Sequence, residues 1–104
     1  MVKVIRESDF GQVEESALAV LDFSATWCGP CRMIAPVLEK LSEEMKGKVE
    51  FFTADVDENP NLAVRFAVQS IPALIFLKNG IEVGREIGFK PEAALRSTLE
   101  SFLG

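Results

Sequence analysis

Histidine is absent from this chain of 104 residues, which removes the usual general base and the commonest nitrogen ligand for metals. Cysteine occurs only twice and tryptophan once. Basic side chains are also outnumbered, 11 against 16 acidic ones, for a formal net charge of −5. General nucleic-acid binding needs a basic patch, so this balance argues against a nucleic-acid partner.

Long apolar runs are missing too, and none approaches the roughly 20 residues of a membrane span. The opening MVKVIRESDF lacks the basic, apolar and small-residue zones of a secretory signal. We therefore expect a cytoplasmic protein with no membrane partner, although a mature form that had lost a targeting peptide would have the same sequence. Thiols are kept reduced in the cytosol, where an exposed cysteine pair is more often catalytic than structural.

What the chain does contain is apolar material. Hydrophobic residues make up 48% of it and include eight Phe, which is enough for one core without disulfide staples. We expect a single domain over residues 1–104. The pattern predicts strands alternating with helices, hence an α/β mixed sheet with helices on both faces. The predicted strands are 2–5, 18–23, 49–56, 73–77 and 82–87, and the predicted helices are 8–15, 30–46, 60–67 and 91–103.

Helix signals and one turn support this reading. Ser8 is a candidate N-cap, and Pro30, Pro60 and Pro91 each fit the first turn of a helix, where the missing N–H has no partner. Pro36 lies inside a predicted helix and should kink it. The last helix is expected to bury an apolar stripe, and Asn79-Gly80 predicts a hairpin between the last two strands. That stripe comprises Leu95, Leu99, Phe102 and Leu103.

The two cysteines lie three positions apart in the stretch ATWCGPCRM. Gly29-Pro30 opens a helix, which places Cys28 at its N-terminus, where free N–H groups and the helix dipole stabilise a thiolate. Cys31 lies one turn inward and should be more buried. A disulfide between them is therefore open to attack at one accessible sulfur: Cys28 forms the mixed disulfide, and Cys31 resolves it.

Two other uses of the cysteines stay open. A structural zinc site needs four ligands, so this chain would have to add carboxylates or a second chain. A purely structural disulfide would close a ring of only four residues, which is worth about 2 kcal/mol in the chain-entropy model.

Asp22 and the Ile71-Pro72 step are the other unusual features. Asp22 lies in the apolar run LAVLDFSA. It is either buried, with its pKa raised toward neutrality and able to relay a proton to or from Cys31, or solvated on an edge strand. Proline is allowed at the first position of a strand, and on sequence alone the trans form of the Ile71-Pro72 bond is favoured.

The motif Trp27-Cys28-Gly29-Pro30-Cys31 is identical to the active-site motif of the thioredoxin family, and the resemblance runs from about Val2 to Leu103. Asp22 stands where that family has its buried acid, and Ile71-Pro72 where it has its cis-proline loop. The resemblance implies the thioredoxin fold, a five-stranded mixed sheet in the order 1-3-2-4-5 flanked by four helices. Gly80 and Gly88 fall at the family's late glycines.

The resemblance also implies a protein-disulfide reductase with no bound cofactor beyond the Cys28–Cys31 redox couple. Cys28 would attack, Cys31 would resolve, and Asp22 would assist proton transfer. A monomer would reduce disulfide-containing clients and be recycled by thioredoxin reductase. Backbone groups of Ile71, beside a cis Pro72, would pair with the client chain. The flat docking face would comprise Trp27, Gly29, Pro30, Ile71 and Gly88.

The Gly-Pro pair between the cysteines favours a reductant, because oxidising members of the superfamily carry other dipeptides there. The known potential of thioredoxin itself, about −270 mV, lies well below the about −180 mV of the disulfide isomerases. A binding or chaperone subunit with the same fold is the alternative. Three residues depart from the family pattern: Thr53 replaces a common lysine near the buried acid, Ala73 replaces a threonine after the cis-proline, and Phe89 is unusually large. Phe89 either extends the docking face or folds back onto the last helix.

Overall fold

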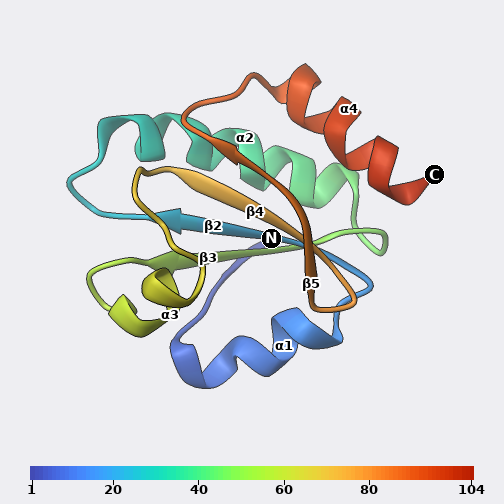
Figure 1. Ribbon diagram of the computed structural model, residues 1–104. Helices are drawn as coiled ribbons and strands as arrows, with labels where there is room; N and C mark the ends of the chain where they lie inside the picture. The colour runs from blue at the N-terminus through green and yellow to red at the C-terminus, as the bar shows by residue number, and fades with distance from the viewer.

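A computed structural model describes all 104 residues, and Figure 1 shows the course of the chain. Short helices and strands alternate along it, as the sequence predicts. The elements are β1 (Val2–Val4), the 3₁₀ helix η1 (Glu7–Asp9), α1 (Phe10–Glu15), β2 (Leu18–Ser24), α2 (Gly29–Glu44), β3 (Glu50–Asp55), α3 (Pro60–Arg65), β4 (Ala73–Lys78), β5 (Ile81–Ile87) and α4 (Glu92–Leu103).

The five strands form one mixed sheet in the order β1-β3-β2-β4-β5. β3 runs parallel to β1 and β2, whereas β4 runs antiparallel to β2 and β5. This confirms the expected strand order and the four flanking helices. β2 lies in the middle of the sheet, so the alternative of an edge strand carrying a solvated Asp22 is wrong.

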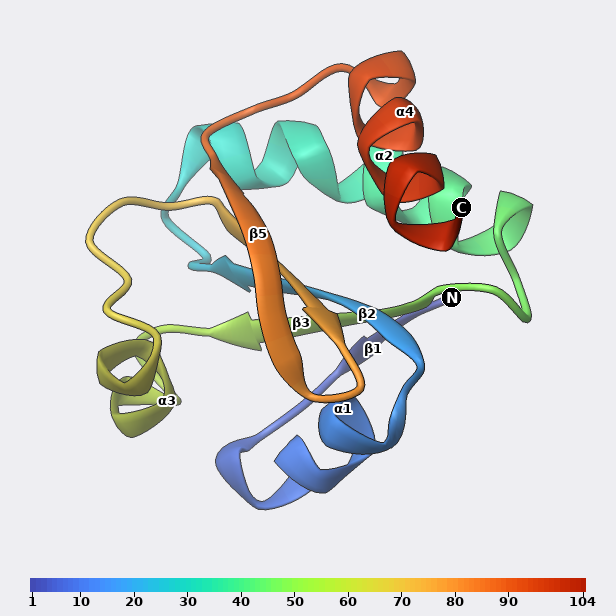
Figure 2. The same cartoon turned by 45° about the vertical axis from the view of Figure 1, so that its right-hand side comes forward.

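Helices cover both faces of the sheet, with α2 and α4 on one side and α1 and α3 on the other (Figures 1 and 2). Each face has its own apolar cluster, because successive side chains of a strand point to opposite faces. In β2, Leu21 and Phe23 join the cluster beside α1 and α3, whereas Leu18 and Val20 join the cluster beside α2 and α4. Burial on both faces explains why β2 and β4 are almost wholly apolar.

Several predicted helix ends are wrong by one or two residues, and one cap is wrong altogether. Ser8 lies inside η1 and is not an N-cap; there the Arg6 N–H donates to Asp9 Oδ2 at 3.0 Å. Pro91 precedes α4 as its N-cap residue instead of entering the first turn. The expected burial of Leu103 is wrong, because this side chain is 41% exposed, whereas the ring of Phe102 packs against Phe76.

The hairpin between β4 and β5 turns at Asn79 and Gly80, as predicted. Both residues have positive φ, 51° and 83°, which matches the twist of an antiparallel pair. Pro36 lies inside α2, which continues to Glu44. None of the helices combines the length and the apolar character that crossing a bilayer requires.

Candidate active site

The two cysteines lie at the junction of β2 and α2, where the chain leaves the sheet and turns into the helix. Cys28 is the N-cap residue of α2, and Pro30 lies in its first turn. Cys28 and Cys31 form a disulfide with their Cα atoms 5.3 Å apart. The Gly-Pro pair therefore does what the sequence predicts: it starts a helix and places both sulfurs at its N-terminal end.

Electrostatics distinguishes the two sulfurs, whereas accessibility does not. The Cys31 N–H donates to Cys28 Sγ at 3.2 Å, so the helix N-terminus is directed at Cys28 and would stabilise a thiolate there. The expectation that Cys28 is the more exposed residue is wrong, because both cysteines are 5% exposed. They share an apolar cluster with Ala25, against which Val56 and Ile71 pack.

The loop before β4 lies against the disulfide. The Ile71-Pro72 bond is cis, so the trans form favoured by sequence alone is wrong and the form implied by the resemblance is present. The Ile71 carbonyl oxygen lies 3.9 Å from Cys28 Sγ, and the Gly88 N–H donates to the Pro72 carbonyl at 2.8 Å. The ends of β4 and β5 are thereby brought to the sulfur pair.

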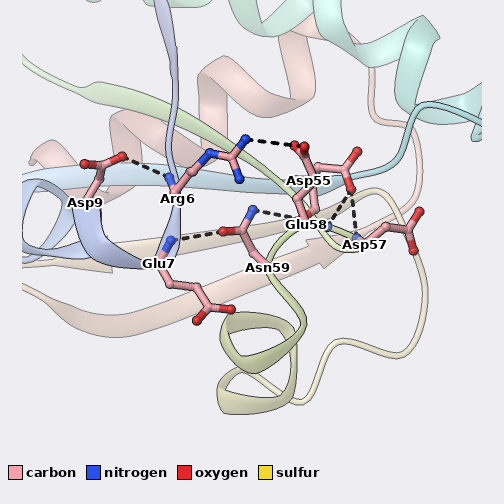
Figure 3. A network of polar contacts seen from close by, with 7 residues as sticks. All are labelled: Arg6, Glu7, Asp9, Asp55, Asp57, Glu58 and Asn59. Atoms are coloured by element: carbon pink, nitrogen blue, oxygen red, sulfur yellow. Dashed lines mark hydrogen bonds and ion pairs between the residues drawn. The ribbon is translucent and has the colours of Figure 1, made fainter.

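Trp27 lies on the surface beside the cysteines, 66% exposed, and is held by one hydrogen bond. Its Nε1–H donates to Asp57 Oδ2 at 2.8 Å. Asp57 belongs to the loop after β3, where Asp55 Oδ1 accepts from the N–H groups of Asp57 at 2.8 Å and Glu58 at 3.2 Å (Figure 3). Sequence reasoning missed Asp57; the run DVDENP, rich in Asp and Asn before a helix, was the available signal.

Asn59 connects the same loop to η1 through its side chain. It is buried, and its Nδ2 donates to the Asp55 carbonyl at 2.9 Å while its Oδ1 accepts from the Glu7 N–H at 3.0 Å (Figure 3). Two segments distant in sequence, η1 and the loop after β3, are thus joined by one side chain. This bracing fixes the position of Asp57 and, through it, the orientation of Trp27.

Asp22 is buried in the middle of the sheet, 4% exposed. Burial raises the pKa of its carboxyl from 3.8 to about 6, and the hydrogen bond from Thr53 opposes this rise. Thr53 Oγ1 lies 3.3 Å from Asp22 Oδ2, whereas Oδ1 has no partner in the protein. The raised value agrees with the expectation that burial would raise the pKa of Asp22 toward neutrality.

Asp22 and Cys31 line the same pocket, whose volume is about 320 Å³. Ser24 and Thr53 line it from the sheet, and the exposed Glu39 lines it from α2. A proton that leaves Cys31 therefore has a carboxyl group facing the same space. The Asp22 carboxyl can therefore accept this proton near neutral pH, and the proton need not cross the packed core.

The comparison with known proteins agrees with this geometry. The thioredoxin family model matches residues 1–101 of the chain. The chain belongs to the thioredoxin family. It is 46% identical over 99 residues to thioredoxins of Staphylococcus aureus strains Mu50 and MW2, which covers 95% of each chain. With the Cys28–Cys31 disulfide in place, this membership identifies a thiol-disulfide oxidoreductase that reduces protein disulfides.

The positions that departed from the thioredoxin pattern can now be placed. Ala73 is fully buried and begins β4, and Thr53 pairs across the sheet with Asp22. Phe89 is 38% exposed and belongs to neither apolar cluster. No three of the Cys, Asp or Glu side chains are grouped so as to hold a metal ion.

Proposed function

We propose that this thioredoxin-family chain reduces client disulfides with Cys28 as the nucleophile and Cys31 as the resolving thiol. The Cys28 thiolate attacks one client sulfur, a mixed disulfide forms, and the first client thiolate leaves. The Cys31 thiolate then attacks Cys28 Sγ, releasing the second client thiolate and closing the Cys28–Cys31 disulfide. Two electrons pass to the client. The hydrogen bond from the Cys31 N–H to Cys28 Sγ carries this assignment, since it favours the anion at Cys28.

Asp22 is the proposed proton acceptor for Cys31. Resolution requires a Cys31 thiolate, so its proton must be taken up when the mixed disulfide breaks down. A carboxyl with a pKa of about 6 is mostly ionised at pH 7 and is a far better base than an ordinary carboxylate. The shared pocket supports this role, because both side chains face it.

The client would dock on a face that surrounds the sulfurs. Its proposed members are Trp27, Gly29, Pro30, Ile71, Pro72 and Gly88. Ile71 lies just outside the β4 ladder, which begins at Ala73, so its backbone groups are free to pair with an extended client segment. The exposed Trp27 and Phe89 would add apolar contact area around that strand.

Partners and cellular context follow from the same reaction. Oxidised protein needs an external electron donor, and a thioredoxin reductase is the proposed one. We place the protein in the cytoplasm as a monomer, with residues 1–104 forming one domain that carries electrons to clients with disulfide bonds. The acidic net charge of −5 supports the absence of a nucleic-acid partner.

Insulin reduction tests the assignment, with dithiothreitol or a thioredoxin reductase as electron donor. Cys28→Ser should abolish turnover, because no nucleophile remains to open the client disulfide. Cys31→Ser should instead accumulate a mixed disulfide with the client, detectable by intact-mass spectrometry. A Cys28→Ser variant that folded and still reduced insulin would overturn the proposal and favour a binding role for the fold.

A redox titration of the Cys28–Cys31 couple against glutathione tests the direction of electron flow. The reductant assignment expects a potential near the about −270 mV of thioredoxin. A value near the about −180 mV of the isomerases would contradict it.

A further inference from the structure

Thr53 lies at the centre of three oxygen atoms in the pocket wall. Its Oγ1 is 3.3 Å from Asp22 Oδ2, 3.2 Å from the Asp22 carbonyl oxygen and 3.3 Å from Ser24 Oγ. Parallel pairing of β2 with β3 brings this about, because it sets Asp22 directly opposite Thr53. A hydroxyl carries one proton, so Thr53 can donate to only one of these three acceptors at a time.

The direction of that hydroxyl depends on the charge of Asp22. A carboxylate can only accept, so Thr53 then donates to Oδ2 and can accept from the Ser24 hydroxyl. A protonated carboxyl can donate to Thr53, whose own proton is then free to turn to the Asp22 carbonyl or to Ser24. Both protonation states of Asp22 therefore keep a partner at Oδ2, and rotation of one hydroxyl is enough to change between them.

We propose that Thr53 is a positioning residue for the resolving step: its hydroxyl rotates as Asp22 takes up and releases the Cys31 proton, with Ser24 as the second hydroxyl of the relay. This rests on the proposed role of Asp22 as proton acceptor. It assigns to a neutral side chain the task of keeping a buried carboxyl usable in both forms. A cation would favour only the ionised form.

The surroundings of Asp22 leave this task to Thr53. Arg32 and Glu39 line the same pocket from α2, and the amino group of Met1 lies 3.7 Å from Glu39 Oε1. β1 contributes only Val2 to the pocket, and the β4 partner of Asp22 is Leu74, so neither strand places a charged side chain in the pocket. Burial and the Thr53 hydrogen bond are the two influences that shift the pKa of Asp22, and they act in opposite directions.

Asp22 itself supplies the readout, through an NMR titration of its carboxyl carbon in the reduced protein. Thr53→Val keeps the shape of the side chain and removes the hydroxyl. It should raise the Asp22 midpoint by about one pH unit, because the hydrogen bond that the carboxylate loses is stronger than the one that the protonated carboxyl loses. Thr53→Ser should restore the midpoint, and Ser24→Ala should raise it by less than Thr53→Val. Thr53→Ala serves as a second hydroxyl-free variant if the valine variant folds poorly.

Rates give the second readout. The pH–rate profile for insulin reduction by Thr53→Val should move to higher pH by the same amount as the Asp22 midpoint, with Thr53→Ser matching the unaltered protein. If Thr53 served only as a cross-strand hydrogen bond to the Asp22 backbone carbonyl, its loss would lower stability without moving either midpoint. Unchanged midpoints in Thr53→Val would therefore overturn the proposal, and an unchanged midpoint in Ser24→Ala would remove Ser24 from it.

The proposed function fails in a different experiment. If Asp22→Asn reduced insulin with an unchanged pH–rate profile, Asp22 would not be the proton acceptor, and the relay would have no catalytic meaning. If Asp22→Asn lost the rise in rate near pH 6 while Thr53→Val left the titration unchanged, Asp22 would keep its role and Thr53 alone would be excluded.

Discussion

At the scale of single residues, Asp22 places a carboxyl group at a buried position whose neighbours are largely apolar. It is the one carboxyl buried in the centre of the sheet, and its Oδ1 has no hydrogen-bond partner in the protein. Such a group destabilises the fold whenever it is ionised. The proposed proton transfer with Cys31, with which Asp22 shares a pocket, would explain why an acid stands there.

The raised pKa of Asp22 predicts how stability changes with pH. Between about pH 4 and pH 6 the folded chain holds the Asp22 proton and the unfolded chain does not, so this group lowers the free energy of unfolding as pH rises through that window. Above pH 6 the destabilisation by Asp22 stays constant, at about 3 kcal/mol for a pKa shift of this size. Asp22→Asn should therefore be more stable than the unaltered protein by up to about 3 kcal/mol at pH 7, and no more stable at pH 4.

Urea unfolding at the two pH values measures this difference. Glu100→Gln is the matched control, because it removes one exposed carboxylate for which no hydrogen bond is found and should change stability by less than about 0.5 kcal/mol at either pH. Equal stability of Asp22→Asn and the unaltered protein at pH 7 would contradict the buried-acid interpretation.

At the scale of elements, the loop after β3 depends on Asn59. Its side chain makes hydrogen bonds with the backbone of Asp55 and of Glu7, and it is buried. Asn59→Ala should lower the free energy of unfolding by about 1–3 kcal/mol, because the Glu7 N–H loses its partner and the Asp55 carbonyl loses one of its two donors. Asn61→Ala is the control: its side chain makes one exposed contact, 3.4 Å from Glu7 Oε2, and should cost less than about 0.5 kcal/mol.

Thermal unfolding separates the two asparagine variants, and Trp27 fluorescence reports the site. Loosening the loop should change the Trp27 emission in Asn59→Ala, since Asp57 of that loop holds the indole N–H. Equal stability of the two variants would show that Asn59 does not brace the loop.

The β4–β5 turn offers a second element-level prediction with its own control. Gly80 has φ of +83°, and an added Cβ would lie 3.4 Å from Glu14 Cα and from the Glu14 carbonyl oxygen. Gly80→Ala should therefore destabilise the protein by about 1–2 kcal/mol. Gly11→Ala adds the same methyl group to a helix where nothing lies within 4 Å, and should stabilise it by about 0.5–1 kcal/mol. Thermal unfolding midpoints that moved in the same direction would contradict the conformational argument.

Patterns local in sequence were predicted well, and features that depend on distant segments were not. The apolar runs of β2 and β4 and the Asn79-Gly80 turn carry their own signals, so the strands and the hairpin could be read directly. Ser8 failed as a cap because the backbone of Arg6 found its partner in Asp9. The near-equal burial of the two cysteines depends on Ile71 and Val56, which are more than twenty residues away in sequence.

The same distinction holds for the site. Cys28, Cys31 and the helix that starts between them follow from five consecutive letters. Whether Asp22 was buried could not be decided from one strand alone, because the answer depends on β3 and β4 lying on either side of it. Asp57 was missed because its contact with Trp27 crosses thirty residues of chain.

At the scale of the whole molecule, the sheet has a protected centre and two open edges. β2 and β4 are covered on both faces by the two apolar clusters, whereas β1 and β5 each have a strand on one side only. β5 is exposed along most of its length, and α1 and α3 have only six residues each. Stability should therefore be distributed unevenly, since segments with few buried contacts open without global unfolding.

Native-state hydrogen exchange, followed by NMR, tests this distribution. Amides of Ala19–Phe23 and Leu74–Leu77 should exchange only through global unfolding, so that their opening free energies equal the value from urea unfolding. Amides of α1, α3 and the outer side of β5 should exchange faster, through local opening. Asp22→Asn, if it stabilises the protein at pH 7, should slow exchange in the central strands and leave the edge segments unchanged. Faster exchange in β2 than in β5 would contradict a stable centre of the sheet. β2 is the strand that carries Asp22 and precedes the segment with the two cysteines.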